Sequence, residues 1–239
     1  QAILGLEMGL KSLKYNDYFN IIVFNDGHST YANAPIQATS EEINKAINAI
    51  RHLSANGGTN VFSALDYALS NQSADNERLR QVVFLTDGDV GNESQLFNLV
   101  SKKLGKSRLF TVGIGSAPNS YFMEKIAEIG RGEHIFIGSV YEVTQRMREL
   151  FAKIENPAIT NLKIIFPNNE DVEYYPKILP DVYSGSPFEV SIRSNKEIQS
   201  AILTGKIGGQ HWEIRMPFSV ATFKGSNPRH TLTLSYKSI

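Results

Sequence analysis

The sequence has no cysteine, no excess charge of either sign and no long apolar run. Without cysteine the chain has no disulfide, no thiolate nucleophile and no cysteine-ligated zinc. An extracellular location is still compatible with this absence, because a large core needs no cross-link. The 24 basic and 24 acidic side chains balance, which argues against nucleic acid or an anionic membrane as a partner recognised by net charge.

The N-terminal stretch also lacks recognisable targeting features. Residues 1–17 contain no basic segment followed by a cleavage site, and they do not begin with methionine. No apolar run in the chain is long enough to span a bilayer. We therefore expect a fragment of a longer polypeptide that is not inserted directly into a membrane.

What is present is the composition of a globular protein. Hydrophobic residues make up 41% and charged residues 20% of the 239 positions, enough to bury a sizeable core in one large domain or two ordinary ones.

The first part of the chain alternates amphipathic segments with short apolar runs. Ile3, Leu6, Leu10 and Leu13 are spaced as on one face of a helix. Short apolar runs predict strands at 19–25, 81–86, 108–114 and 134–138, with an edge strand at 28–32. Further helices are predicted from Thr39 or Ser40, after Gly58, at 93–104, from near Pro118 and up to about Glu155. Continuous apolar strands alternating with helices predict an α/β domain over residues 1–155, with a doubly wound, mostly parallel sheet covered on both faces.

The pattern changes after Asn156 and Pro157. Beyond them, apolar residues alternate with polar ones, as at 188–193, 211–216 and 231–234. Such period-two runs between turn residues predict a small all-β, sandwich-like module over residues 156–239. Trp212 lies on one of these runs, and we expect it in the core of that module.

Two loops of the α/β part carry residues suited to a ligand site. Asp87 follows the apolar run 81–86, and Thr59 precedes the helix that starts with "NVFSALDYALS". In an open α/β sheet, ligands bind beyond the carboxyl ends of the strands. A carboxylate and a hydroxyl on neighbouring loops there suit a hard cation such as Mg²⁺. Each residue also has a structural explanation, since Thr59 can cap a helix and Asp87-Gly88 can form a turn.

Other motifs point to no function. The stretch "DGDVGNE" begins like a calcium loop but has Asn92 and Asn98 where that loop needs glycine and glutamate. "GIGSAP" is best explained as a tight strand-to-helix turn. The five histidines have no ligand spacing, which indicates surface or hydrogen-bonded histidines.

The ordered set "GGTN", "VVFLTDGDVGNE" and "FTVGIGSAPN" resembles the von Willebrand factor type A domain, in the version of the inter-alpha-trypsin inhibitor heavy chains and their bacterial relatives. The resemblance covers about residues 1–155. It implies a Rossmann-like fold with a divalent cation in a metal-ion-dependent adhesion site (MIDAS), held by a DxSxS loop, a threonine and an aspartate. The threonine corresponds to Thr59 and the aspartate to Asp87.

This sequence departs from the family pattern at its start. The strand and DxSxS loop that should precede the first helix are absent, and Asp26 does not replace them because it ends a different strand. Thr59 and Asp87 alone would hold a cation weakly. Since the absent strand lies in mid-sheet in this family, its removal should leave an edge that recruits a substitute strand or a second copy of the chain.

The resemblance implies a non-enzymatic adhesion or assembly module of the cell surface, the extracellular space or the periplasm. Its partner would be a protein or an extracellular-matrix ligand that donates a carboxylate to the cation. Two alternatives are a metal-dependent phosphohydrolase using Asp87 and Asp89, and a scaffold that has lost its metal.

Overall fold

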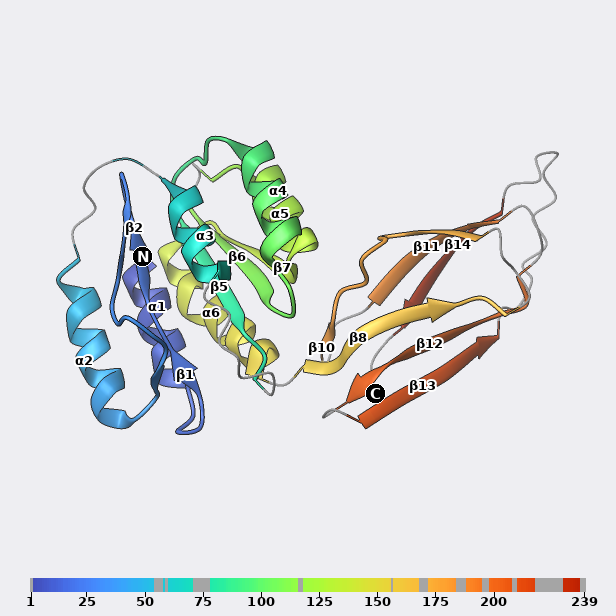
Figure 1. Ribbon diagram of the computed structural model, residues 1–239, viewed down its shortest axis with the longest axis horizontal. Coiled ribbons are helices and arrows are strands. Elements are labelled where there is room, and N and C mark those ends of the chain that lie inside the picture. The colour runs from blue at the N-terminus through green and yellow to red at the C-terminus, as the bar shows by residue number, and fades with distance from the viewer. Residues whose placement is uncertain are drawn as a thin grey trace. The chain divides into compact units, whose positions relative to one another are not determined.

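The computed structural model divides into two compact units, Gln1–Ala152 and Lys153–Ile239 (Figure 1). It describes residues 2–53, 58, 60–70, 78–115, 118–155, 157–167, 172–183, 188–194, 198–207, 210–217 and 230–236. Among these residues, no helix combines the length and the apolar character needed to cross a membrane.

The first unit is built on a parallel sheet of order β5-β6-β7. All seven residues of β6 are buried, as expected for a central strand covered on both faces. A helix follows each strand. The elements are β5 (Gln81–Thr86), α4 (Glu93–Lys103), β6 (Arg108–Ile114), α5 (Ser120–Ile129), β7 (Arg131–Ile137) and α6 (Val140–Glu155). The alternation predicted from the sequence is confirmed, although β7 begins three residues earlier than the apolar run at 134–138 indicates.

Helices cover both faces of this sheet. Figure 1 shows α4 and α5 on one side and α6 on the other. On the α4–α5 side, Phe84 and Leu109 from the strands pack in one core with Leu96 and Phe122 from the helices. This confirms the predicted α/β architecture.

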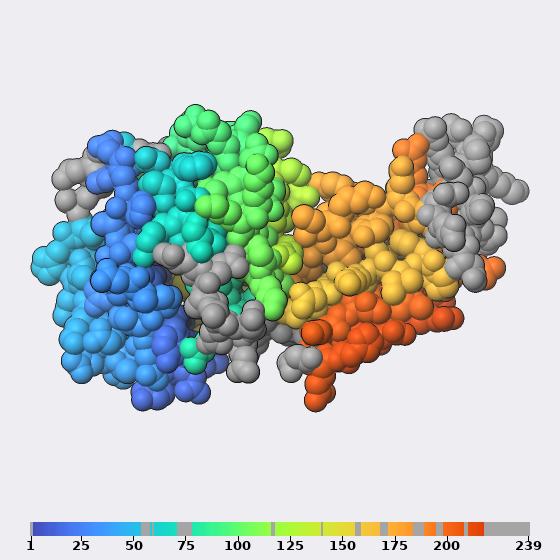
Figure 2. All heavy atoms as spheres, viewed as in Figure 1, coloured from blue at the N-terminus to red at the C-terminus, as the bar shows by residue number. Residues whose placement is uncertain are grey.

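Most of the N-terminal elements lie beside the parallel sheet, on one flank of the first unit (Figure 2), and the last of them, α3, packs in the core on the α4–α5 side of the sheet. They are α1 (Ala2–Ser12), β1 (Tyr18–Phe19), β2 (Ile22–Phe24), β3 (His28–Thr30), β4 (Ile36–Gln37), α2 (Ser40–Arg51) and α3 (Val61–Ser70). Strands β2 and β3 form an antiparallel hairpin, and β1 pairs with β4. Thr39 caps α2 by accepting the Glu42 N–H at 3.2 Å. This is one of the two caps predicted, and it satisfies a donor that the first helical turn leaves free.

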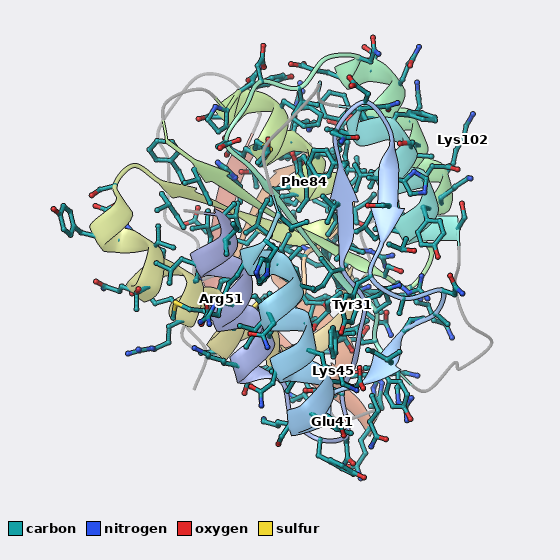
Figure 3. The ribbon with its side chains drawn as sticks, turned by 90° about the vertical axis from the view of Figure 1, so that its left-hand side faces the viewer. Tyr31, Glu41, Lys45, Arg51, Phe84 and Lys102 are labelled. Atoms are coloured by element: carbon teal, nitrogen blue, oxygen red, sulfur yellow. The ribbon has the colours of Figure 1, made fainter. Side chains whose placement is uncertain are left out.

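In the described part of the chain, β5 pairs with β6 alone and β2 pairs with β3 alone. The rings of Phe24 on β2 and Phe84 on β5 nevertheless meet, with centroids 5.6 Å apart, and Figure 3 shows Phe84 beside the β2–β3 hairpin. In a parallel pair, alternate residues of a strand direct their N–H and C=O groups to opposite neighbours. The Arg80 carbonyl accepts the Arg108 N–H, so the backbone groups of Arg80 face β6. Val83 and Leu85 lie an odd number of positions further along, and their backbone N–H and C=O groups therefore point away from β6. The recruitment of a substitute strand or a second copy to this edge stays a prediction.

The second unit contains two antiparallel sheets, of order β10-β8-β12-β13 and β14-β11-β9. Val190 and Ile192 are buried while Glu189 and Ser191 are exposed, so the predicted alternation is confirmed on β11. Trp212 packs against the core shared by the two sheets, as expected. The strands are β8 (Pro157–Ile165), β9 (Val172–Tyr175), β10 (Val182–Tyr183), β11 (Phe188–Ser194), β12 (Ser200–Ile207), β13 (Gln210–Pro217) and β14 (His230–Tyr236). The side chains of the run at 231–234 lie outside the described part.

Candidate functional site

Asp87 lies at the carboxyl end of β5, in a short turn built by its neighbours. The Thr86 hydroxyl accepts the Gly88 N–H at 3.2 Å, which turns the chain away from the strand. Asp87 is exposed, and among the described residues its carboxylate has no hydrogen bond or ion pair. Its position beyond a parallel strand is the one expected for a ligand-binding carboxylate.

Asp89, two residues later, is held differently. It is also exposed, but its Oδ1 accepts the backbone N–H of Val90 at 2.9 Å. The side chain therefore supports the turn that leads towards α4. The two aspartates of the motif have the same charge, yet only Asp87 has both oxygens available to a ligand in the described structure.

The start of α3 lies at the same edge of the sheet as Asp87. Lys103, the last residue of α4, contacts Asp66 at 2.5 Å and Ser70 at 2.9 Å, so the C-terminal ends of α3 and α4 lie together. Arg80, just before β5, donates to the Ala68 carbonyl at 2.9 Å, which places the end of α3 near the start of β5. The beginning of α3 is therefore towards the carboxyl end of β5.

Thr59 lies outside the described residues, but both of its sequence neighbours are described and are held by the turn after β2. The Gly58 N–H donates to Asp26 Oδ1 at 2.8 Å. Asn60 donates its backbone N–H to the Asn25 carbonyl at 2.6 Å and its side-chain amide to the Asp26 carbonyl at 3.1 Å. Sequence reasoning gave Asp26 no part in this edge, and no motif links it to Gly58, which is 32 positions away.

The described residues offer few ligands for a metal. They contain no group of three or more histidine, aspartate or glutamate side chains that could hold an ion. The donors proposed from the sequence, a carboxylate and a hydroxyl, are hard oxygen atoms that suit Mg²⁺, which usually keeps several water ligands. The chemistry of Asp87 and Thr59 thus fits Mg²⁺, with most of the coordination shell left to water or a partner.

Large aromatic side chains are exposed near the first turns of three helices in this unit. Phe62 on α3 is 41% exposed, Tyr121 on α5 is 67% exposed and Tyr141 on α6 is 95% exposed. Because α5 and α6 each follow a parallel strand, their first turns lie at the carboxyl edge of the sheet, like that of α3. Exposed aromatic side chains are common in protein interfaces.

Four histidines have contacts typical of surface or hydrogen-bonded residues, as predicted. His28 packs on the ring of Tyr67 with centroids 5.2 Å apart, and His52 lies 2.7 Å from the Asn48 carbonyl. His211 is 3.6 Å from Glu213. His134 on β7 contacts Thr111, while the side chain of His230 lies outside the described part.

The contact of His134 with Thr111 shows which ring nitrogen of the imidazole carries the proton. The Thr111 hydroxyl donates to the Met123 carbonyl at 2.9 Å. Its oxygen therefore accepts from His134 Nδ1, 3.0 Å away. Nε2 is buried without a hydrogen-bond partner among the described residues. Burial lowers the pKa of His134 below its ordinary value of 6.5, against smaller opposing effects of Thr111 and Glu124.

This lowered pKa predicts a pH-dependent stability. Since the unfolded chain binds the proton more tightly than the folded one, the contribution of His134 is complete above pH 6.5 and is lost as the pH falls towards the folded-state pKa. Urea unfolding of the wild type and of His134→Gln at pH 7, 6 and 5 should show the difference in free energy of unfolding shrinking as the pH falls. A difference that stays constant over this range would contradict the assignment.

The match to a family model lies within the first unit. A family model described as the von Willebrand factor type A domain matches residues 1–136, which is more than half of the chain. The chain belongs to the von Willebrand factor type A domain family. The resemblance derived from the "GGTN" and "TDGD" motifs is thus confirmed.

Curated relatives of this chain come from Dictyostelium discoideum and from mammals. A von Willebrand factor A domain-containing protein of Dictyostelium discoideum is 29% identical over 162 residues, covering 67% of this chain and 17% of that protein. The inter-alpha-trypsin inhibitor heavy chain H4 of Homo sapiens is 27% identical over 227 residues, covering 89% of this chain and 24% of that protein. The chain therefore spans about a quarter or less of the length of these relatives.

Solved structures share the fold at low identity. A von Willebrand factor type A protein from Catenulispora acidiphila superposes with a TM-score of 0.66 at 17% identity, over 90% of this chain and 60% of that one. Proximal thread matrix protein 1 of the mussel byssus, with a zinc-occupied MIDAS motif, gives a TM-score of 0.52 at 14% identity, over 63% of this chain and 39% of that one.

Proposed function

We propose that this chain is a non-enzymatic binding module that engages a protein or extracellular-matrix ligand through a divalent cation at the carboxyl edge of the β5-β6-β7 sheet. Thr59 and Asp87 would bind the cation, and a carboxylate of the partner would complete the site. The observation that carries the proposal is the Asp87 carboxylate, exposed at the end of β5 with no hydrogen-bond or ion-pair partner in the described structure. Proximal thread matrix protein 1 of the mussel byssus has a zinc-occupied MIDAS motif. A cation site in that protein supports the proposal by analogy.

The bound cation would supply positive charge for the partner's carboxylate. The chain itself would contribute the Asp87 carboxylate and the Thr59 hydroxyl, and the remaining ligands would be water until the partner arrives. Because two protein ligands hold Mg²⁺ weakly, we expect low affinity for the ion alone and a gain in affinity for both when ion and partner bind together.

The exposed aromatic side chains favour a protein as the partner. Phe62, Tyr121 and Tyr141 lie on three helices that begin at the edge where Asp87 lies. They would supply apolar contact area around a polar centre, which is the arrangement of many protein interfaces.

The different environments of the two aspartates favour binding over hydrolysis. A phosphohydrolase would use both Asp87 and Asp89 in the reaction, whereas one oxygen of Asp89 already accepts the Val90 N–H and supports the turn. In the proposed module Asp89 has a structural role in the turn, and the chain turns over no substrate.

The proposal is tested by titrating Mg²⁺ and Mn²⁺ calorimetrically into the wild type, Asp87→Asn and Asp89→Asn. The two variants lose the same charge from the same turn, and in Asp89→Asn the remaining amide oxygen can still accept the Val90 N–H. We expect Asp87→Asn to weaken binding at least about tenfold, since it removes an anionic ligand, and Asp89→Asn to stay within about twofold of the wild type, since charge alone acts weakly at an exposed site.

Other results would select the alternatives. Equal losses in the two variants would indicate non-specific attraction of the ion. No binding by the wild type would favour the metal-free scaffold. Turnover of generic phosphate esters that disappears in Asp87→Asn would establish an enzyme instead.

Two further properties belong to the same proposal. We place the protein at the cell surface, in the extracellular space or in the periplasm, where a matrix ligand is accessible.

A homodimer through the free edge of β5 would pair the backbone groups of Val83 and Leu85. A monomer in light scattering would count against that dimer.

A further inference from the structure

Strand β13 forms a free edge of the larger sheet in the second unit. The sheet has the order β10-β8-β12-β13, and in the described part of the chain β13 pairs with β12 alone (Figure 1). This pairing covers all eight residues of β13 without an irregularity. About half of the N–H and C=O groups of a strand in an antiparallel pair point away from its neighbour. β13 therefore presents a row of backbone donors and acceptors that another strand can bind.

The other edges of the second unit are less suited to strand addition. β9 has four residues and is followed by Pro176, and β10 has two residues with a shift in its pairing to β8. β14 also lies at an edge, but its side chains lie outside the described part. Among the edge strands whose side chains are described, β13 is the longest.

The two faces of β13 differ in chemistry. The inner side chains are half-buried and pack against the core shared by the two sheets: Trp212, Ile214 and Met216. The outer side chains alternate with them and are exposed and polar: His211, Glu213 and Arg215. A strand that binds to this edge must therefore match apolar groups on one face and charges on the other.

The charges on the outer face complement a second copy of the same strand. A two-fold axis perpendicular to the sheet makes the two β13 strands antiparallel and keeps their outer faces on the same side. When the axis passes at Ile214, Glu213 of each copy lies opposite Arg215 of the other. Opposite charges directly across an antiparallel pair are stabilising. In the described part of a single chain Glu213 contacts His211 at 3.6 Å and Arg215 makes no ion pair.

The neighbouring registers have the opposite effect. An axis at position 213 places Glu213 opposite Glu213 of the second copy, and an axis at position 215 places Arg215 opposite Arg215. Like charges directly opposite each other are destabilising. Of these three registers, only the one centred on Ile214 pairs each charge with a charge of opposite sign.

The same register matches the apolar inner face. Trp212 of one copy lies opposite Met216 of the other, and the two Ile214 side chains lie opposite each other. These side chains are only half-buried within one chain, so a second copy would cover area that is still exposed to water. Burial of apolar area is the main favourable contribution to most protein association, and tryptophan and methionine are enriched in interfaces. Both faces of β13 therefore favour one register.

We propose that the free edge of β13 binds β13 of a second copy of this chain, antiparallel and centred on Ile214. The two larger sheets then join into one continuous sheet across the two-fold axis. This dimer requires no bound cation, and it uses a different edge from that of β5 in the first unit.

The experiment measures association of the full chain by sedimentation equilibrium at protein concentrations up to about 1 mM. Trp212 is the only tryptophan of the chain, so its fluorescence reports on this edge and not on β5. We expect a monomer–dimer equilibrium, with a shift of the Trp212 emission to shorter wavelength at the same midpoint concentration, because the second copy shields the indole from water. Both signals should stay unchanged when EDTA removes divalent cations.

Charge reversal tests the register. Glu213→Arg places two pairs of like charge across the interface, and we expect the dissociation constant of the dimer to rise at least about tenfold. Arg215→Glu should have the same effect, and it provides a second variant if the first folds poorly. The double variant Glu213→Arg/Arg215→Glu restores both pairs of opposite charge, so its dissociation constant should return to within about threefold of the wild type.

Glu189→Arg is the matched control. Glu189 is exposed on β11, which has a paired strand on each side, so the same change of charge occurs in the same unit without a free edge. This variant should leave the dimer unchanged, and urea unfolding of all variants checks that they fold as the wild type does.

Each contrary result overturns the proposal for a distinct reason. A monomer at every concentration would show that the edge does not associate. A dimer without the Trp212 shift, or one that Glu213→Arg leaves intact, would assign association to another surface such as the β5 edge. Failure of the double variant to recover would exclude the register centred on Ile214. Equal weakening by Glu189→Arg would reduce the effect to net charge.

Discussion

Gly132→Ala is expected to destabilise the first unit by at least about 3 kcal/mol, at the upper end of the cost of inserting an atom into a packed interior. A β-carbon at position 132 would overlap the carbonyl oxygen of Leu109 and would lie 2.7 Å from its carbonyl carbon. Both atoms belong to the backbone of β6, the central strand, so no side-chain rotation relieves the clash.

The need for glycine arises from an irregularity in the pairing of β6 and β7. Leu109 lies opposite Arg131 and Thr111 lies opposite His134, so β7 has one extra residue between these pairs. Arg131 also has a positive φ of 54°. Such a bulge brings the two backbones unusually close, and Gly132 lies within it.

Urea unfolding followed by circular dichroism measures this effect. Gly91→Ala is the matched control, because nothing lies within 4 Å of a β-carbon at that position. There the loss of unfolded-state freedom should leave stability unchanged or raise it by up to about 1 kcal/mol. Equal unfolding midpoints for Gly132→Ala and the wild type would contradict the close approach of β7 to β6.

Phe122→Ala is expected to lower the free energy of unfolding by about 3–5 kcal/mol, as is usual when a fully buried aromatic side chain is removed. Phe122 is 0% exposed and belongs to the core between the sheet and helices α3, α4 and α5. Its ring also contacts that of Phe97, with centroids 5.5 Å apart. The variant loses both the buried apolar area and this ring contact.

The neighbouring residue provides the control. Tyr121 lies on the same turn of α5 but is 67% exposed, so Tyr121→Ala should change stability by less than about 0.5 kcal/mol. If the carboxyl edge binds a protein partner, Tyr121→Ala should instead weaken that interaction. Similar destabilisation by the two substitutions would show that α5 does not pack as described.

The two aspartates of the "TDGD" motif show where sequence reasoning stops. The position of Asp87 directly after the apolar run 81–86 predicts that it lies at the carboxyl end of a strand, and it does. Nothing in the motif indicates that Asp89 accepts the Val90 N–H while Asp87 remains available. That difference depends on the path of the backbone through the turn, which a residue pattern does not specify.

For the histidines, the sequence predicted the kind of contact they make but not their burial. Their spacing matched no metal motif, and the contacts found for His28, His52 and His134 agree with that interpretation. The sequence did not indicate which histidine would be half-buried with an enclosed ring nitrogen. His134 lies on β7, and its partner Thr111 lies on β6, 23 positions earlier, so the burial of its ring depends on the pairing of these strands.

Hydrophobic periodicity by itself determined the parallel α/β unit, the change to alternating strands beyond residue 156 and the place of Asp87 at a strand end. These features follow from which side chains a short segment must bury, and a local pattern records that directly. Only the tertiary structure decided that Asp26 reaches Gly58 across 32 positions and that Gly132 lies against the backbone of Leu109. Such contacts arise because packing brings distant segments together, and no local pattern specifies which segments meet.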